Sequence, residues 1–141
     1  MVDIGGARMS TYAVGQDLAP QTFIINRTLL VGYANASGDQ NPIHQNEEFA
    51  KSVGLENVIA HGMFTMALAG RYLSAIAGSA NVKEFSARFT KPVAVPADVD
   101  VELIVSGKVL EVSDGAIKVE VNAICNDVKV LGMSKAVVAI R

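Results

Sequence analysis

The most apolar stretch of the chain is Met63–Ile76, which contains good helix formers and no proline. Its apolar residues surround nearly the whole circumference of the predicted helix, and a helix of that kind is buried rather than lying on a surface. Beyond it the period becomes two, so that Phe85, Ala87 and Phe89 alternate with polar residues. This alternation predicts a strand over Val82–Thr90 whose apolar face covers the buried helix.

Three further strands are expected, at about Val99–Leu110, Ala116–Ile124 and Val128–Ile140. Pro92 and Pro96 separate them from the first strand, because proline cannot donate a hydrogen bond to a strand ladder. Ser113–Gly115 has the composition of a hairpin turn, and Asn126-Asp127 is expected to form another.

Shorter elements are predicted ahead of the buried helix. An extended segment, Gln21–Ile25, leads to Asn26, whose side chain is suited to capping a helix. That helix is expected over Arg27–Ala36 and should stop at Gly38, because glycine is common just past a helix end. A second short helix is expected over Glu47–Val53.

These elements together define an α+β fold, in which a curved antiparallel sheet of four strands wraps around one long central helix. A length of 141 residues fits one domain. We expect that domain to occupy residues 11–141, after a flexible leader over residues 1–10 that is rich in small side chains.

Composition limits the classes of partner. Charged residues make up 18% of the chain and hydrophobic residues 50%, which suggests surface that a second subunit covers. A net charge of −2 without any basic run argues against a nucleic-acid partner. No apolar run is long enough to span a bilayer, and the N-terminus lacks the pattern of a signal peptide. We therefore expect a cytoplasmic oligomer with no membrane partner.

Cys125 is the only cysteine and lies in an alternating apolar segment, where a buried thiol is expected. One cysteine and two histidines fall short of the usual ligand set of a structural zinc ion. We expect no metal site.

Candidate chemistry is concentrated around two short segments that hold both histidines of the chain. Asp39 and His44 flank a loop stiffened by Pro42, so that the backbone fixes their separation. An imidazole beside a carboxylate is suited to moving a proton near neutral pH. Gly62 and Met63 open the buried helix, where free N–H groups stabilise negative charge on an oxygen.

A simpler interpretation exists for each residue alone. An aspartate in such a turn is ordinary turn chemistry, and a histidine after it fits a buried hydrogen-bonding group. Taken together, these residues belong to a string over residues 33–44 whose residue types and order turn formation alone does not require.

The segment Ser37–His44 resembles the hydratase-2 motif of the MaoC-like proteins, the (R)-specific enoyl-thioester hydratases. Ala60–Met63 and Arg88–Val93 are similar to two further landmarks of that family, and the resemblance covers nearly the whole chain. On Ile59–Met66 and Val93–Pro96 the chain also resembles the catalytic subunit of mycobacterial-type (3R)-hydroxyacyl-ACP dehydratases, which act in long-chain fatty-acid elongation.

The resemblance implies a hot-dog fold, an acyl-CoA or acyl-ACP substrate, and no metal or redox cofactor. It implies that Asp39 and His44 activate a water molecule, with His44 as the proton acceptor. Asn41 would hold His44 or its loop, and the N–H of Gly62 would bind the thioester oxygen as it gains charge.

Substrate-binding residues are predicted at Asn41, Met63, Gly70 and Arg88. Gly70 and its small neighbours on the helix would leave room for an acyl chain. Arg88, on the face opposite the phenylalanines, is a candidate contact to the phosphates of CoA or to an acidic carrier protein.

Other functions remain open at this stage. Thioesterases and hydroxydecanoyl-type dehydratases resemble each other in carrying a catalytic carboxylate on the central helix, and Met63–Ile76 contains none. A non-catalytic subunit that binds only the acyl chain would be expected to lack the Asp39/His44 pair. A catalytic subunit that needs a similar hot-dog partner is also consistent with the sequence, so the oligomer is either a homodimer or a heterodimer.

Overall fold

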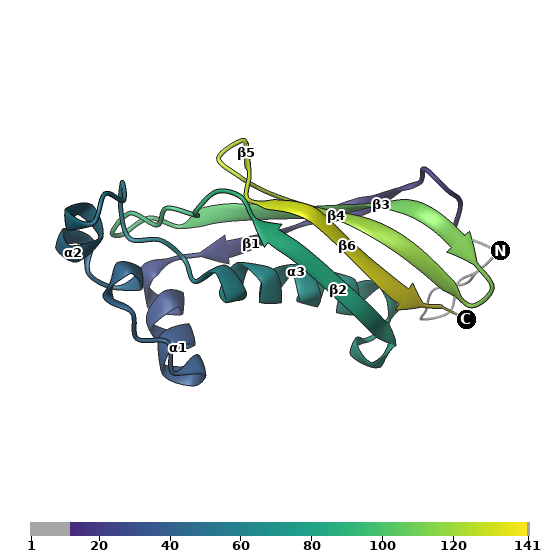
Figure 1. Cartoon of the computed structure of the whole chain (residues 1–141), viewed down its shortest axis with the longest axis horizontal. Coiled ribbons are helices and arrows are strands. Elements are labelled where there is room, and N and C mark those ends of the chain that lie inside the picture. Colours follow the sequence, from purple (N-terminus) through teal and green to yellow (C-terminus); the bar gives the residue numbers. More distant parts are fainter. Residues whose placement is uncertain (1–11, 141) are drawn as a thin grey trace.

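A computed structural model describes residues 12–140 of the chain. An antiparallel sheet runs along the molecule, and one long helix, α3, lies across one face of it (Figure 1). The strands are β1 (Asp17–Ile25), β2 (Val82–Phe89), β3 (Val101–Ser113), β4 (Ala116–Cys125), β5 (Val128–Lys129) and β6 (Leu131–Ala139). The helices are α1 (Arg27–Ser37), α2 (Glu47–Ser52) and α3 (Gly62–Ala77), with short 3₁₀ turns η2 (Pro42–His44) and η3 (Ser79–Asn81).

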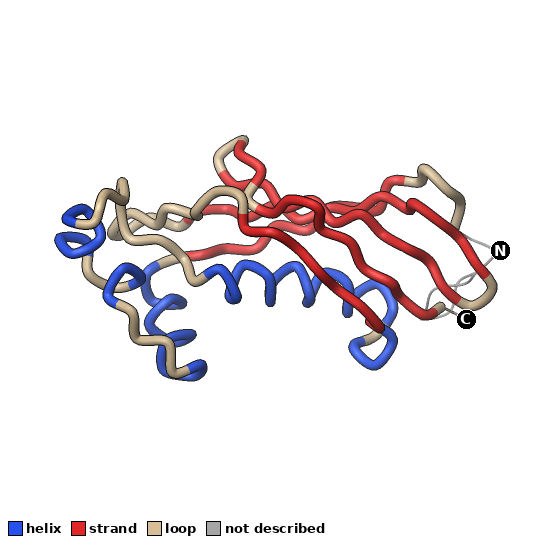
Figure 2. The backbone as a smooth tube through the Cα atoms, viewed as in Figure 1, coloured by secondary structure: helices blue, strands red, loops and turns tan. Residues whose placement is uncertain are grey.

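The predicted α+β architecture is confirmed, since the sheet packs on α3 and the small helices α1 and α2 gather at one end (Figure 2). The strand order is β1-β3-β4-β6-β2, with β5 paired to β4. In the described part of the chain β1 and β2 therefore form the two edges of the sheet. The leader predicted over residues 1–10 lies outside the described residues.

The expectation of four strands was wrong, because the sheet has six. The segment predicted over Gln21–Ile25 extends back to Asp17 and pairs with β3. Pro20 interrupts this strand, and the register shifts between Leu18 and Gln21, which hides the alternation in the sequence. At the other end of the chain, the single predicted strand is divided into β5 and β6.

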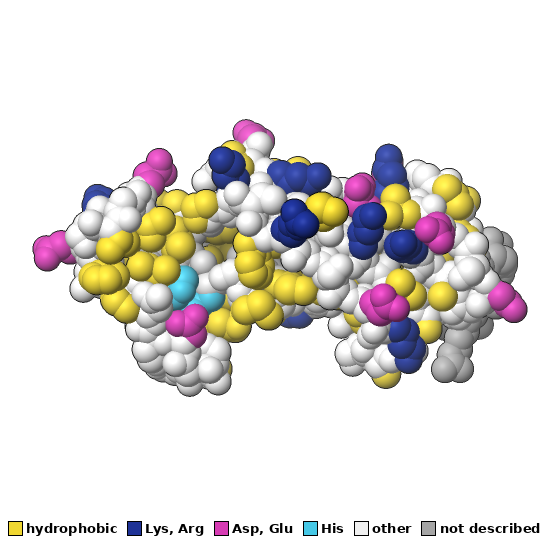
Figure 3. Space-filling view, in the orientation of Figure 1, with side chains coloured by type: hydrophobic (Ala, Val, Ile, Leu, Met, Phe, Trp, Pro, Cys, Tyr) yellow, Lys and Arg dark blue, Asp and Glu magenta, His cyan; other side chains and the backbone are white. Residues whose placement is uncertain are grey.

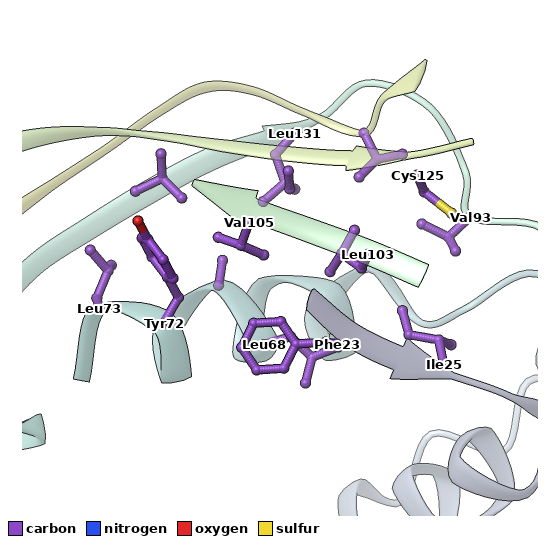
Figure 4. Packing of buried hydrophobic residues seen from close by; sticks show 14 of the residues in the cluster. Phe23, Ile25, Leu68, Tyr72, Leu73, Val93, Leu103, Val105, Cys125 and Leu131 are labelled. Atoms are coloured by element: carbon purple, nitrogen blue, oxygen red, sulfur yellow. The ribbon is translucent and has the colours of Figure 1, made fainter. Parts of the chain in front are cut away.

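The core lies between the inner face of the sheet and α3 (Figure 4). Alternate residues of β3 and β4 face inward, which is the period of two that a half-buried strand requires. Leu103 of β3 and Leu73 of α3 are both fully buried. Each such side chain contributes roughly 1.5–3 kcal/mol by leaving water.

The prediction that α3 is buried on all sides was wrong. Its buried face carries Thr65, Leu68, Ala69, Tyr72 and Leu73, as the sheet covers only this face. The opposite face is exposed in the single chain. A helix with apolar residues on all sides is therefore fully buried only where a second element or subunit covers the face that the sheet leaves open.

The predicted caps of α1 are confirmed, and the bounds of the three helices differ from the predicted ones by one residue. The side chain of Asn26 accepts a hydrogen bond of 2.9 Å from the N–H of Leu29 at the start of α1. Gly38 ends that helix with a φ of 85°, a backbone conformation that favours glycine. No helix of residues 12–140 has both the length and the hydrophobicity needed to cross a lipid bilayer.

Candidate active site

The loop between α1 and η2 is held in place by its own side chains. Asp39 Oδ1 accepts a hydrogen bond from the N–H of Asn41 at 3.1 Å, and Asn41 Oδ1 accepts one from the N–H of Ile43 at 3.2 Å. The backbone N–H of His44 donates to the carbonyl of Asn41 at 3.1 Å. Short polar side chains that bond two residues ahead are what this turn chemistry requires, and they fix the loop locally.

His44 is oriented by the backbone of Ile59, on the opposite side of the site. Its ring is 7% exposed, and Nδ1 lies 2.7 Å from the carbonyl oxygen of Ile59. Since a carbonyl oxygen only accepts hydrogen bonds, Nδ1 carries the proton and Nε2 of the neutral ring keeps its lone pair. The N–H of Ile59 in turn donates to the carbonyl of Ile43 at 3.1 Å. The backbone of Ile59 therefore anchors both the ring and the loop that carries it.

The carboxylate of Asp39 faces the free nitrogen of His44. Asp39 Oδ2 and His44 Nε2 are 3.9 Å apart, and the Asp39 side chain is about half exposed at 51%. This separation is too long for a direct hydrogen bond, so a small polar molecule between the two atoms would bond to both. The predicted Asp39/His44 arrangement is thus compatible with holding a water molecule.

His61 lies directly behind His44, at the residue that precedes α3. The two rings are stacked with centroids 3.8 Å apart and planes inclined by 24°. His61 is 2% exposed, and its Nε2 donates to the backbone carbonyl of Asp39 at 3.1 Å. Burial lowers the pKa of His61 below its ordinary value, the nearby His44 lowers it further, and Asp39 opposes both effects. The ring is therefore neutral at pH 7.

A cavity of about 340 Å³ opens beside these side chains. It is lined by His44, Ile59, Ala60, Gly62, Thr65, Phe89, Thr90, Lys91, Pro92, Val93 and Val130. In Figure 3 the histidine side chains are visible at a hollow bordered by hydrophobic side chains, toward the end of the molecule where α1 and α2 lie. Such a lining suits a largely apolar ligand with one polar end at the histidines.

Gly62 is the first residue of α3, so its N–H has no partner within the helix and is available beside the cavity. A Cβ at this position would lie 3.1 Å from Cε2 of Phe89. Phe89 was predicted to cover α3, but its ring is 53% exposed and forms part of the cavity wall instead. Phe85 and Ala87, the other members of the predicted stripe, do pack against the core.

A partly buried arginine, Arg27, connects the segments around this site. Arg27 Nε donates to the carbonyl of Val95 at 2.6 Å, and one of its terminal nitrogens bonds to Asn57 at 2.8 Å and Glu47 at 2.9 Å. The hydrogen bonds from Arg27 and Lys51 lower the pKa of Glu47. These contacts tie the start of α1 to α2 and to the strand-like segment that carries Ile59.

The other predicted substrate-binding residues lie away from the cavity lining. Met63 is 58% exposed and Arg88 is exposed on the edge strand β2. Gly70 borders open space, since a Cβ there would meet nothing within 4 Å. Asn41 uses its side chain within the loop.

His61 and Thr65 were given no role from the sequence, and Phe89 was predicted only as part of the strand face that covers α3. An available signal for His61 was its position immediately before the helix-opening Gly62.

The same cluster offers potential metal ligands. Asp39, His44 and His61 have ligand atoms within 4.8 Å of one another. One nitrogen of each histidine is engaged by a carbonyl, which leaves each ring a single nitrogen for another partner. A neutral imidazole with one free nitrogen beside a carboxylate is also suited to proton transfer.

Taken together, the fold and site define a hot-dog domain with an aspartate–histidine pair beside a cavity at the start of its central helix. The chain belongs to the MaoC-like family, because the model of the MaoC like domain matches residues 10–128.

Similar proteins extend this assignment. The chain is 48% identical over 70 residues to 3-hydroxyacyl-thioester dehydratase X of Mycobacterium tuberculosis, covering 46% of this chain and 22% of that protein. A solved MaoC-like dehydratase is 32% identical, with a TM-score of 0.93 over 97% of this chain and 43% of that one. R-hydratase PhaJ1 from Pseudomonas aeruginosa is 26% identical, with a TM-score of 0.81 over 94% of this chain and 84% of the hydratase. This chain thus spans less than half the length of the first two relatives.

Proposed function

We propose that this chain is an (R)-specific enoyl-thioester hydratase, or a (3R)-hydroxyacyl-thioester dehydratase in the reverse direction, of fatty-acid metabolism. The observation that carries the proposal is the 3.9 Å gap between His44 Nε2 and Asp39 Oδ2 at an apolar cavity. The names of the MaoC-like relatives, a 3-hydroxyacyl-thioester dehydratase and an R-hydratase, support the same class of substrate and the R configuration.

In the hydration direction, a water molecule bonds to Asp39 and to Nε2 of His44. His44 takes a proton from the water as its oxygen attacks C3 of the enoyl thioester, and the C2–C3 double bond shifts its electron pair toward the thioester oxygen. The N–H of Gly62 donates to that oxygen as it gains charge. The proton then returns to C2, so that one water molecule is added and no redox partner is needed.

The remaining predicted contacts keep subsidiary roles. Asn41 holds the loop through its bond to Ile43. Met63 and Gly70 on α3 are proposed to border the acyl chain, and Arg88 to meet phosphates of CoA or acidic groups of a carrier protein. Lys91 joins Arg88 in this proposal, because it lines the cavity.

We further propose a cytoplasmic protein with residues 11–141 as one MaoC-like domain, assembled as a homodimer or with a similar hot-dog subunit. The support is an open edge at β2 and an exposed, largely small-residue face on α3. The second candidate function is a non-catalytic or obligate partner subunit of a hetero-oligomeric dehydratase. The partial span of the first two relatives favours it, since this chain matches less than half of the length of each.

The purified protein should hydrate trans-2-enoyl-CoA substrates, followed as loss of the conjugated-enoyl absorbance over a series of chain lengths. The product should be the (R)-3-hydroxyacyl thioester, as judged by coupling to enantiomer-specific dehydrogenases. Native mass measurement of the same sample separates a homodimer from an isolated subunit. Binding of enoyl thioester without turnover, by the protein alone and with candidate hot-dog partners, would favour the non-catalytic reading.

Gly62→Ala should lower kcat/KM roughly tenfold, a fraction of what loss of a whole oxyanion donor costs. The added Cβ would lie 3.1 Å from the ring of Phe89, so either the ring or the helix start must shift to relieve the contact. The same substitution in a Phe89→Ala background should have an effect about threefold smaller, because contacting residues couple. Equal losses in both backgrounds would contradict this contact as the cause.

A further inference from the structure

His61 is buried more completely than any group of the proposed reaction, yet only one of its two ring nitrogens has a partner. Nε2 donates to the carbonyl of Asp39, and Nδ1 has no hydrogen-bond partner among the described residues. Three titratable groups face the ring: Asp39 from the loop, His44 from η2 and Tyr33 from α1, whose ring centroid lies 4.8 Å away. Burying a polar atom without a hydrogen-bond partner costs free energy, so other contacts of the His61 ring must offset that cost.

We propose that His61 is a positioning residue. It holds the backbone of Asp39 by a hydrogen bond and stacks against the ring of His44, so that both residues face the same water molecule. The inference rests on the proposed function, because it concerns the pair that would perform the reaction. His61 touches neither the water nor the cavity and acts only through these two residues.

The first contribution of His61 is the placement of Asp39. The carboxylate of Asp39 is half exposed, and its loop is otherwise fixed by bonds between near neighbours in the sequence. The hydrogen bond from His61 connects residues 22 apart and attaches the loop to the start of α3. Since α3 also presents Gly62 to the cavity, this bond sets the distance between the acid–base pair and the oxyanion donor. An error of about 1 Å in such a distance costs roughly a hundredfold in rate.

The second contribution is the orientation of His44. The bond to Ile59 restrains the His44 ring at Nδ1, so rotation of the ring about its Cβ–Cγ bond is opposed by a hydrogen bond at one atom. The stacked ring of His61, at 3.8 Å, blocks this motion on one side.

The third contribution is electrostatic. When His44 accepts a proton it becomes a cation, and a second cation 3.8 Å away would oppose that step. Burial keeps His61 neutral, so the ring supports His44 without repelling its charged form. Lysine or arginine would fill the site but would add the repulsion.

Two substitutions separate the donor of His61 from its ring. His61→Phe keeps a flat ring against His44 and removes the N–H donor. His61→Gln places an amide N–H near the position of Nε2 and removes the stacked ring. We expect kcat in hydration to fall about tenfold or more in His61→Phe, with KM changed less than about threefold, and His61→Gln to recover at least half of the loss on a logarithmic scale.

The pH profile gives a readout that a purely structural role would not move. In His61→Gln the lost stack should shift the acidic limb of the kcat profile, which reports the proton acceptor, whereas in His61→Phe the limb should keep its position at lower amplitude. Wild-type kcat and an unshifted limb in both variants would overturn the inference. So would equal losses in both variants that match their losses in melting temperature.

NMR tests the inference without any turnover. The chain has two histidines, so His61→Gln leaves one set of imidazole signals and assigns both rings. Long-range ¹H–¹⁵N spectra of the wild type should show His44 as the Nδ1–H tautomer and His61 as the Nε2–H tautomer, with His61 still neutral where an exposed histidine is half protonated. A His61 that titrates normally or carries its proton on Nδ1 would sink the positioning role. An inactive wild type with the expected tautomers would instead sink the proposed function.

Discussion

Asp39→Asn and His44→Ala should each lower the rate of enoyl-thioester hydration roughly a hundredfold or more, the range measured for general acid–base groups. His44→Ala removes the Nε2 lone pair that would accept the proton of the water, and Asp39→Asn replaces one acceptor oxygen with a donor. Both residues lie outside the sheet, Asp39 in a loop and His44 in η2, so both variants should stay folded, with the lower melting temperature in His44→Ala because the bond to Ile59 is lost. The measurement is kcat and KM under single-turnover and steady-state conditions with the same enoyl-CoA.

Asp114→Asn is a matched control for the aspartate variant, because Asp114 is exposed in the turn between β3 and β4, at the far end of the molecule from the site. It should retain wild-type kinetics. Turnover that survives in both Asp39→Asn and His44→Ala would end the acid–base assignment, whatever the effect of the control.

Leu103→Ala should lower the free energy of unfolding by about 2–5 kcal/mol. Leu103 is fully buried near the start of β3, on the face of the strand that packs into the core, and truncation leaves a cavity there. Ile104, the next residue, points to the opposite face and is 40% exposed. Ile104→Ala should therefore cost about 1 kcal/mol or less.

Urea unfolding at one fixed protein concentration measures both variants, since an oligomer gains apparent stability with concentration. The contrast between adjacent residues is the test of the packing. If Ile104→Ala is as destabilising as Leu103→Ala, the outer face of β3 is covered in the assembled protein, and the assignment of inner and outer faces in solution must change.

The sequence predicts well the features that depend on neighbours along the chain. The caps of α1 at Asn26 and Gly38 follow from single residues, and the turn at Asn126-Asp127 has the positive φ angles that these residue types tolerate. The proximity of Asp39 and His44 belongs to the same class, because one stiff turn joins them.

Features that depend on residues far apart in the chain were missed. The contact of His61 with Asp39 spans 22 residues and forms only when α3 docks beside the loop. Phe89 fits the alternation of β2, but it is the last residue of the strand, where its ring turns toward Gly62 and the cavity. The exposed face of α3 was not predicted, since hydrophobicity alone does not say how many neighbours a helix has.

The polar groups of the proposed chemistry come from residues 38–62, a detour of the chain between the first strand and the long helix that adds no strand to the sheet. Most of the tightly packed interior belongs to other parts of the molecule. The residues of the proposed reaction and most residues that stabilise the fold therefore lie in separate segments of the chain. A few substitutions in residues 38–62 can abolish the proposed turnover and leave the fold intact. A duplicated copy of this chain would therefore need few changes to become a subunit that only binds an acyl chain.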